Sequence, residues 1–309
     1  MTEDLGTLLS NGFNTWKRNL NICFPFIFNI FVNVIVAIIA LIAIIFAVLM
    51  PLLYEIGISD PFTLFNMDEK ELEAIIISAI PVISAHITEY LSIIVVIIIV
   101  SVIIMALVQA FFTAGAVGMA KSATGTGRTT LSDMIKFGKQ NFINLLLAEI
   151  VIGLIILAGI VFVVPGFLAI DFTHGFSEKD FTSFALIFIG AFIWFIYALI
   201  ISIALSVVQY ALVIENLGPI DAISTGFKFF RNHKLDVFLV WLFIIAISIG
   251  LGIIGQIVGL IPYLNVIWFF VNMLISVVVI YPLMTLWWTR LYMSRTGMPI
   301  AEDLLSHPF

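Results

Sequence analysis

Residues 22–53 read ICFPFIFNIFVNVIVAIIALIAIIFAVLMPLL, a run of thirty-two residues without a charged side chain. A helix needs about 20 apolar residues to cross hydrocarbon about 30 Å thick, so this run can span a bilayer. It is too long for the apolar part of a cleaved signal peptide, which has about 7–15 residues. In lipid only a helix or a closed barrel satisfies the backbone, and apolar and polar residues do not alternate here. The run therefore predicts a transmembrane helix.

Five further apolar runs of spanning length follow along the chain. They are residues 91–120, 142–164, 181–214, 237–261 and 266–291. The 309 residues are 62% apolar and 10% charged, whereas a soluble domain has about 25% charged residues. We therefore predict an all-α integral membrane protein with six transmembrane helices, organised as a single transmembrane domain over residues 1–309. The single cysteine, Cys23, excludes an intrachain disulfide, and the net charge of −6 argues against nucleic acid as a partner.

Lysine and arginine are distributed unequally between the segments that connect these runs. Lys70 and Lys179 fall on one side, and the other eleven of the thirteen cations fall on the opposite side. The eleven are Lys17, Arg18, Lys121, Arg128, Lys136, Lys139, Lys228, Arg231, Lys234, Arg290 and Arg295. Because cytoplasmic loops carry the excess of cations, we expect a multi-pass protein of the cell membrane with both termini in the cytoplasm.

The segments before the first, third and fifth runs share a pattern. Gly12, Gly138 and Gly226 each follow apolar residues at three and four positions before them, with cations nearby. This spacing predicts short amphipathic helices in the headgroup layer, and therefore three repeats over residues 1–120, 121–215 and 216–295. The alternative is that any cytoplasmic segment entering a membrane is amphipathic and basic, without true repetition. Thr130 and Asp133 predict a capping box at the start of the second copy.

The loop between the first two runs has a pattern of its own, over residues 54–90. Asn66 with Glu69 predicts a helix cap, and acidic residues and a series of isoleucines follow. We expect an acidic amphipathic helix that ends near Pro81 and rests on the outer surface. Whether it covers a cavity or only coats lipid stays open.

Two short segments carry a family resemblance. Residues 214–223 read IENLGPIDAI, with Gly226-Phe227 and Arg231-Asn232 after them, and residues 288–295 read WTRLYMSR. They resemble YciC-like proteins and the membrane domain attached to some glycerophosphodiester phosphodiesterases, a group of six-span proteins. Gly226 departs from the pattern, since the relatives tend to carry serine there. The resemblance implies a six-span architecture and supplies no catalytic residues.

A few polar residues interrupt the apolar runs at similar depth from the basic side. Glu149 is about 12 Å into the third run at 1.5 Å per residue, and an ionisable group in a membrane is a functional hypothesis by default. The full set is Asn29, Asn33, Gln109, Glu149 and Gln209. Together these residues would form an inner polar seam in which Glu149 binds a proton, a cation or a lipid amine. The alternative is that the amides only hydrogen-bond between helices.

Two further sets of residues are candidates for binding. Seven cations would surround the bundle near the inner headgroups and contact anionic lipid: Lys17, Arg18, Lys136, Lys139, Lys228, Arg231 and Lys234. On the outer side, His86 with Glu89 and Asp171 with His174 are weak candidates for a divalent metal site, because each pair is three residues apart. Topology alone would also place the cations, and ordinary solvation would explain the outer pairs.

No nucleophile, base or metal motif of a soluble enzyme is present in the sequence, and no cofactor is implied. The sequence favours a non-enzymatic membrane protein that handles lipid, organises the membrane or assists another membrane protein. Its expected partners are membrane lipids, with a protein partner left open. The alternative is a transporter of a small solute or lipid that uses the seam around Glu149.

Overall fold

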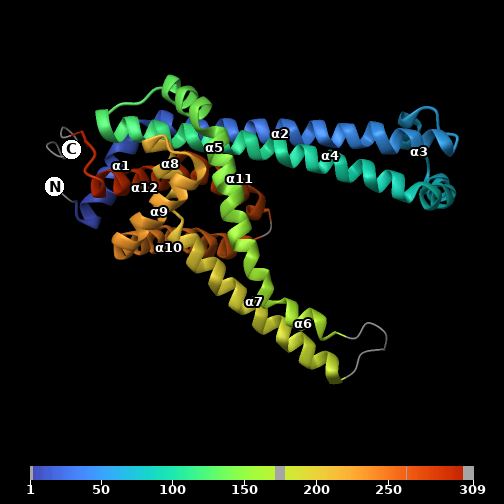
Figure 1. Ribbon diagram of the computed structural model, residues 1–309. Coiled ribbons are helices and arrows are strands. Elements are labelled where there is room, and N and C mark those ends of the chain that lie inside the picture. Colours follow the sequence, from blue (N-terminus) through green and yellow to red (C-terminus); the bar gives the residue numbers. More distant parts are fainter. Residues whose placement is uncertain (1–2, 171–177, 262, 302–309) are drawn as a thin grey trace. The chain divides into compact units, whose positions relative to one another are not determined.

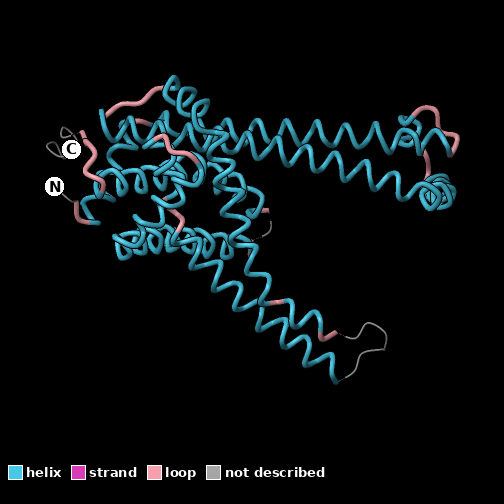
Figure 2. The backbone as a smooth tube through the Cα atoms, viewed as in Figure 1, coloured by secondary structure: helices cyan, strands magenta, loops and turns pink. Residues whose placement is uncertain are grey.

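The computed structural model describes residues 3–170, 178–261 and 263–301 (Figure 1). Within these ranges it contains helices and no strand (Figure 2). Six stretches of the described chain are long and apolar enough to cross a membrane: Leu20–Glu55, Glu69–Thr126, Leu131–Phe162, Phe181–Glu215, Lys234–Gly259 and Leu264–Arg295. The predicted all-α membrane protein with six spanning helices is confirmed.

Each span is built from one or more helical segments. The helix α1 (Leu5–Arg18) precedes the first span, which comprises the 3-10 turn η1 (Leu20–Cys23), α2 (Phe24–Ile44), the π turn η2 (Ile45–Leu49) and α3 (Met50–Glu55). A 3-10 segment, η3 (Pro61–Asn66), leads to the second span, α4 (Glu69–Thr126). The third span is α5 (Leu131–Ala158) with η4 (Gly159–Phe162), and α6 (Val164–Leu168) follows it.

The remaining spans follow the same principle. The fourth comprises α7 (Glu178–Ala204) and α8 (Val208–Glu215), and α9 (Pro219–Asn232) connects it to the fifth span, α10 (Lys234–Gly259). The sixth comprises α11 (Leu264–Ile275), the π turn η5 (Ser276–Ile280) and α12 (Tyr281–Arg295). The predicted capping box is confirmed at the start of α5, where the Thr130 hydroxyl accepts from the Asp133 N–H and the Asp133 carboxylate accepts from the Thr130 N–H.

Prolines explain both π turns. Pro51 and Pro282 each lie in the first turn after a π turn, and proline has no N–H to donate within a helix. The preceding turn widens: the Met50 N–H donates to the Ile45 carbonyl and the Tyr281 N–H to the Ser276 carbonyl, each five residues earlier. Such single π turns let a helix continue past an irregularity, so the first and sixth spans keep their length.

The outer helix differs from its prediction in two respects. It does not end near Pro81, because α4 runs without a break from Glu69 to Thr126 and contains Pro81. The predicted cap at Asn66 and Glu69 is also wrong. Asp68 and Glu71 form the reciprocal pair instead: the Asp68 carboxylate accepts from the Glu71 N–H at 2.8 Å, and the Glu71 carboxylate accepts from the Asp68 N–H at 3.1 Å.

The chain divides into two compact units. The hairpin unit, residues 28–109, contains most of the first span and the first part of α4. The hub unit is formed by the residues up to 27 and from 110 onward, and therefore includes the end of α4 and the third to sixth spans. In the hub unit α1 packs on α12, α9 packs on α8, and α5 packs on both α8 and α9.

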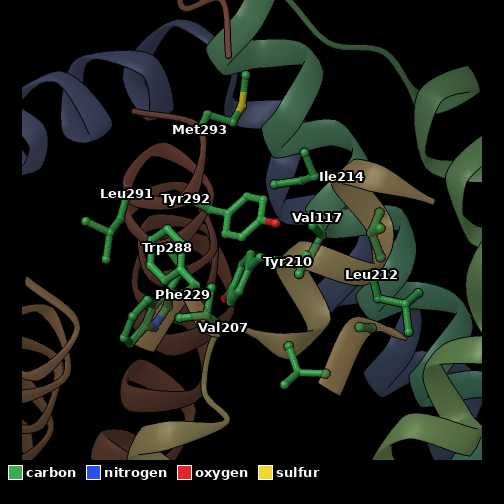
Figure 3. Close-up of a cluster of buried hydrophobic side chains, with 14 of the residues drawn as sticks. Val117, Val207, Tyr210, Leu212, Ile214, Phe229, Trp288, Leu291, Tyr292 and Met293 are labelled. Atoms are coloured by element: carbon green, nitrogen blue, oxygen red, sulfur yellow. The ribbon is translucent and has the colours of Figure 1, made fainter. Parts of the chain in front are cut away.

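The core of the hub unit is partly aromatic. Figure 3 shows Tyr210 of α8 close to Trp288 and Tyr292 of α12, with Phe229 of α9 beside them. The rings of Tyr210 and Trp288 stack with centroids 6.2 Å apart, and those of Phe229 and Tyr292 are 5.0 Å apart. In contrast, within the apolar 18-residue stretch of each described span, at most 17% of the residues are buried inside the protein. The rest of that surface is left to face lipid.

The three glycines of the sequence pattern all lie at close helix contacts of the hub unit. A Cβ added at Gly12 would lie 2.5 Å from Cδ1 of Trp287 in α12. The same addition at Gly138 would lie 2.9 Å from Phe111 in α4, and at Gly226 2.7 Å from Val208 in α8. Real Cβ atoms do not approach so closely, so each position needs glycine. Each predicted interfacial segment is thus held on the second span of a hairpin.

Candidate functional site

A cavity of about 200 Å³ lies in the hub unit between α5 and the junction of α7 with α8. It is lined by Leu145, Ala148, Glu149, Ile152, Leu205, Ser206, Val208 and Gln209. Two successive turns of α5 supply the first four residues, because positions 145, 148, 149 and 152 share one face of a helix. We call it the Glu149 cavity.

The other wall of the Glu149 cavity is a break in the fourth span. The helix ends at Ala204 and begins again at Val208. Across the break the bonds shorten to three residues: the Ser206 N–H donates to the Ile203 carbonyl at 3.3 Å, and the Val208 N–H donates to the Leu205 carbonyl at 3.1 Å. The regular pattern of the spanning helix is therefore interrupted beside Glu149. Non-helical backbone inside a membrane is tolerated where it is buried in protein or lines a cavity.

The Glu149 cavity brings together two of the five residues of the predicted seam. Glu149 and Gln209, sixty residues apart in sequence, line the same space, and Ser206 adds a hydroxyl. Ser206 donates its hydroxyl proton to the Ile203 carbonyl at 2.9 Å, so its oxygen lone pairs remain available to a ligand. Among the described residues, no ion-pair or hydrogen-bond partner reaches the Glu149 carboxylate.

The other three seam residues lie in the hairpin unit and bond to one another. Asn29 donates to Oε1 of Gln109 at 2.5 Å, and Asn33 donates to Oδ1 of Asn29 at 3.0 Å. The chain of amides thus joins α2 to α4 across the hairpin. For these three residues the geometry is that of polar contacts between helices.

All seven cations predicted to contact headgroups have exposed side chains: Lys17, Arg18, Lys136, Lys139, Lys228, Arg231 and Lys234. They belong to α1, the first turns of α5, α9 and the start of α10. Two of them lie over aromatic rings, Lys17 over Phe13 at 4.6 Å and Lys136 over Phe137 at 5.7 Å. We call these seven residues the basic set.

The segments that carry the basic set are fixed from their opposite face. In α1 the residues Leu8, Asn11, Gly12 and Thr15 are buried, while Lys17 and Arg18 are exposed. In α9 the residues Ala222, Gly226 and Phe229 are buried, while Lys228 and Arg231 are exposed. The apolar faces expected to rest in the headgroup layer are therefore partly occupied by spans of the same chain.

Sequence reasoning missed a set of polar contacts inside the hub unit. Lys121 donates to the Ile214 carbonyl at 2.7 Å, and the Tyr292 hydroxyl donates to the Glu215 carboxylate. Arg290 is fully buried and pairs with Glu3. From the sequence, Lys121 and Arg290 were used only to predict the orientation of the spans in the membrane. Residues 288–295, WTRLYMSR, mix polar with apolar residues without forming one hydrophobic face. This mixture was the available signal that the polar side chains have partners inside the protein.

Of the two weak candidate pairs for a metal site, only His86 with Glu89 lies within the described residues. His86 lies 3.4 Å from Glu89 and 3.6 Å from Glu55, all in the hairpin unit. Asp171 and His174 lie outside the described residues. The part of the chain that the structure describes holds no group of three or more histidine, cysteine or acidic side chains arranged for a metal ion.

Comparison with known proteins gives a family match. Residues 74–297 match the family described as Domain of unknown function (DUF7847). A protein of Archaeoglobus fulgidus named "Uncharacterized protein" is similar to this chain, with 23% identity over 312 residues that cover 96% of the chain and 97% of the relative. No solved structure matches the chain.

Proposed function

The chain belongs to the family described as Domain of unknown function (DUF7847), and on that premise we propose that it is a non-enzymatic membrane protein that handles lipid at the inner leaflet of the cell membrane. Its proposed partners are membrane lipids, both termini lie in the cytoplasm, and no cofactor is required. Organising the membrane or assisting another membrane protein are forms that this role can take. We include in this proposal a relationship to YciC-like proteins and to the phosphodiesterase-linked membrane domain. That relationship would supply no catalytic residues, which agrees with a non-enzymatic role.

The observation that carries this proposal is the exposure of the whole basic set, four of whose members lie on α1 and α9, helices whose opposite faces pack against spans. A cation near an anionic leaflet contributes about 1 kcal/mol toward lipid binding, and the effect falls off within a Debye length. Seven such cations on rigid segments would hold anionic headgroups around the hub unit. Rigid segments also lose little conformational freedom when lipid binds, which favours lasting contact over transient contact.

Quantitative mass spectrometry of lipids that co-purify with the protein tests this proposal. Wild-type protein in mild detergent should retain anionic lipid over zwitterionic lipid. The triple variant Lys17→Gln, Lys136→Gln, Lys228→Gln should lose most of that preference, because about 1 kcal/mol per residue is close to a fivefold change in affinity. Lys70→Gln is the matched control, since Lys70 is exposed and lies outside the basic set. Equal anionic lipid in the triple variant and the control would reject the proposal.

A second candidate function, transport of a small solute or lipid, is supported by one separate observation. The fourth span is broken beside the Glu149 cavity, and transporters commonly build substrate sites at interrupted spans near the middle of the membrane. Counter-flow in liposomes that is abolished by Glu149→Gln would favour this candidate. Full counter-flow in Glu149→Gln, or none in the wild type, would leave lipid handling as the better account.

A further inference from the structure

We propose that the Glu149 cavity binds a primary ammonium group, carried either by a small soluble amine or by the headgroup of an aminophospholipid. The proposal deepens the second candidate function by naming its ligand class, and it rests on that function only for what happens after binding. Three features of the site support the proposal: the cavity, its single ionisable lining residue and its hydrogen-bonding groups.

In its ionised form Glu149 would select a cation. Glu149 is the single ionisable residue among those that line the cavity, and no described cation lies within ion-pairing distance of its carboxylate. A carboxylate without a counter-charge inside a membrane protein is costly, so such groups occur with a partner or beside a pathway. An anionic ligand would add a like charge to this site and is disfavoured.

The hydrogen-bonding groups select an ammonium over a metal ion. Glu149, Ser206 and Gln209 line the same small space, and each side chain contains an oxygen that can accept a hydrogen bond, while a primary ammonium has three N–H donors to satisfy. Calcium takes six to eight oxygen ligands and magnesium a near-octahedral set, whereas the described residues form no metal-binding cluster. A quaternary ammonium has no N–H group and would leave the three acceptors without bonds.

The size and walls of the cavity set the class of molecule. Its volume is about 200 Å³, and a water molecule occupies about 30 Å³ in the liquid, so an ethanolamine-sized group with one or two waters fits. The remaining lining is aliphatic, from Leu145, Ile152 and Val208. Such walls accept the carbon chain of an alkylamine, whereas a hydrated metal ion has no apolar part to contact them.

Another hollow of the hub unit does not compete for this role. About 590 Å³ of space lies along the outer part of α7, beside Phe184 and Phe188, and its surface is almost wholly apolar. It has no charged lining residue to recognise a headgroup. Lipid chains are its natural neighbours in a bilayer.

Thermal unfolding of the purified full chain, with and without amine, tests the proposal at constant pH and ionic strength. In detergent the probes are ethanolamine, choline as the quaternary analogue and ethylene glycol as the neutral one. Nanodiscs of phosphatidylglycerol with either phosphatidylethanolamine or phosphatidylcholine form the lipid arm. Ethanolamine should raise the unfolding temperature above both analogues if the amine is soluble. A rise confined to phosphatidylethanolamine nanodiscs assigns the headgroup instead.

Two variants identify the cavity as the place of binding. Glu149→Gln should weaken amine binding at least tenfold, while Glu73→Gln, which changes an exposed carboxylate outside the cavity, should bind as the wild type does. If Glu149→Gln does not fold, titration calorimetry on the wild type still decides, by comparing ethanolamine with choline and ethylene glycol. The proposal is overturned if neither amine source exceeds its analogues, or if Glu149→Gln binds equally well. If amine binding is rejected in this way but anionic lipid still co-purifies with the wild-type protein, the lipid-handling proposal is unaffected.

Discussion

The buried guanidinium of Arg290 donates two hydrogen bonds to the carboxylate of Glu3, from Nε to Oε2 at 2.8 Å and from Nη2 to Oε1 at 2.5 Å. Arg295 extends the contact by donating to the Glu3 carbonyl at 2.8 Å and to the Asp236 carboxylate at 2.6 Å. The segment before α1 is thereby fixed to the end of the sixth span and to the start of the fifth. The hub unit is closed by polar contacts as well as by its aromatic core.

Glu3→Gln should destabilise the protein. Removing one partner of a buried ion pair leaves the other charge without compensation and costs about 3–5 kcal/mol, and Arg290 has 0% exposure. Thermal unfolding in detergent should show a clear fall in unfolding temperature. Glu73→Gln changes an exposed carboxylate and should have almost no effect; equal stability of the two variants would refute the role given to the pair.

Gly226→Ala and Gly252→Ala should change stability in opposite directions. A Cβ at Gly226 meets Val208 at 2.7 Å and its backbone at about 3.0 Å, whereas at Gly252 nothing lies within 4 Å. Crowding at the first site costs about 1–3 kcal/mol, and alanine at the second gains up to about 1 kcal/mol of helix propensity. The two unfolding temperatures, measured side by side, check this. A stabilising Gly226→Ala would show that α9 does not rest on α8 at this point.

Asp4 makes the stability of α1 depend on pH in the acid range. The Thr7 N–H and hydroxyl both donate to its carboxylate, at 2.8 and 2.9 Å, and they hold the pKa of Asp4 below its ordinary value of 3.8. Its stabilising contribution is therefore complete above that value and is lost as the pH falls through the lower, folded pKa. Asp4→Ala should lower the unfolding temperature at neutral pH, and its difference from the wild type should shrink in acid. Asp4→Asn keeps a cap and should show little of this pH dependence; a constant difference for Asp4→Ala would argue against the cap.

The amide chain of the hairpin unit should be structural. Asn29→Leu breaks two hydrogen bonds and should cost about 0.6–2 kcal/mol. Asn33→Leu should cost less, because it breaks one bond and removes an Oδ1 atom that is buried without a partner in the described chain. Thermal unfolding ranks the two variants, and amine binding should be unchanged in both. Loss of amine binding in Asn29→Leu would return this residue to a shared seam with Glu149.

Local patterns were sufficient for much of the fold. Spanning length and apolar composition located all six spans, since in lipid these alone require a helix, and Thr130 with Asp133 located a helix start. Local patterns failed where two signals competed. Asn66 and Asp68 are both good caps, and Pro81 is tolerated in α4 although proline ordinarily ends a helix.

The candidate site needed the fold as well. Glu149 and Gln209 were identified as polar interruptions, but only the packing of α5 on α8 brings them to one cavity. No glycine or proline in the sequence signals the break in the fourth span, because residues 205–207 are leucine, serine and valine. The contacts of Glu55 with His86 and of Glu3 with Arg290 could not be predicted from local patterns either, because each joins residues far apart in sequence.

Labelling with a membrane-impermeant maleimide tests most directly the central claim that the basic set faces one leaflet. Lys17→Cys, Lys139→Cys and Lys228→Cys would each be made in a Cys23→Ser background, with Lys70→Cys as the marker of the opposite side. In sealed inside-out vesicles the first three should react, and Lys70→Cys should react only after the membrane is permeabilised. Protection of any of the three, or reaction of Lys70→Cys in sealed inside-out vesicles, would contradict the account.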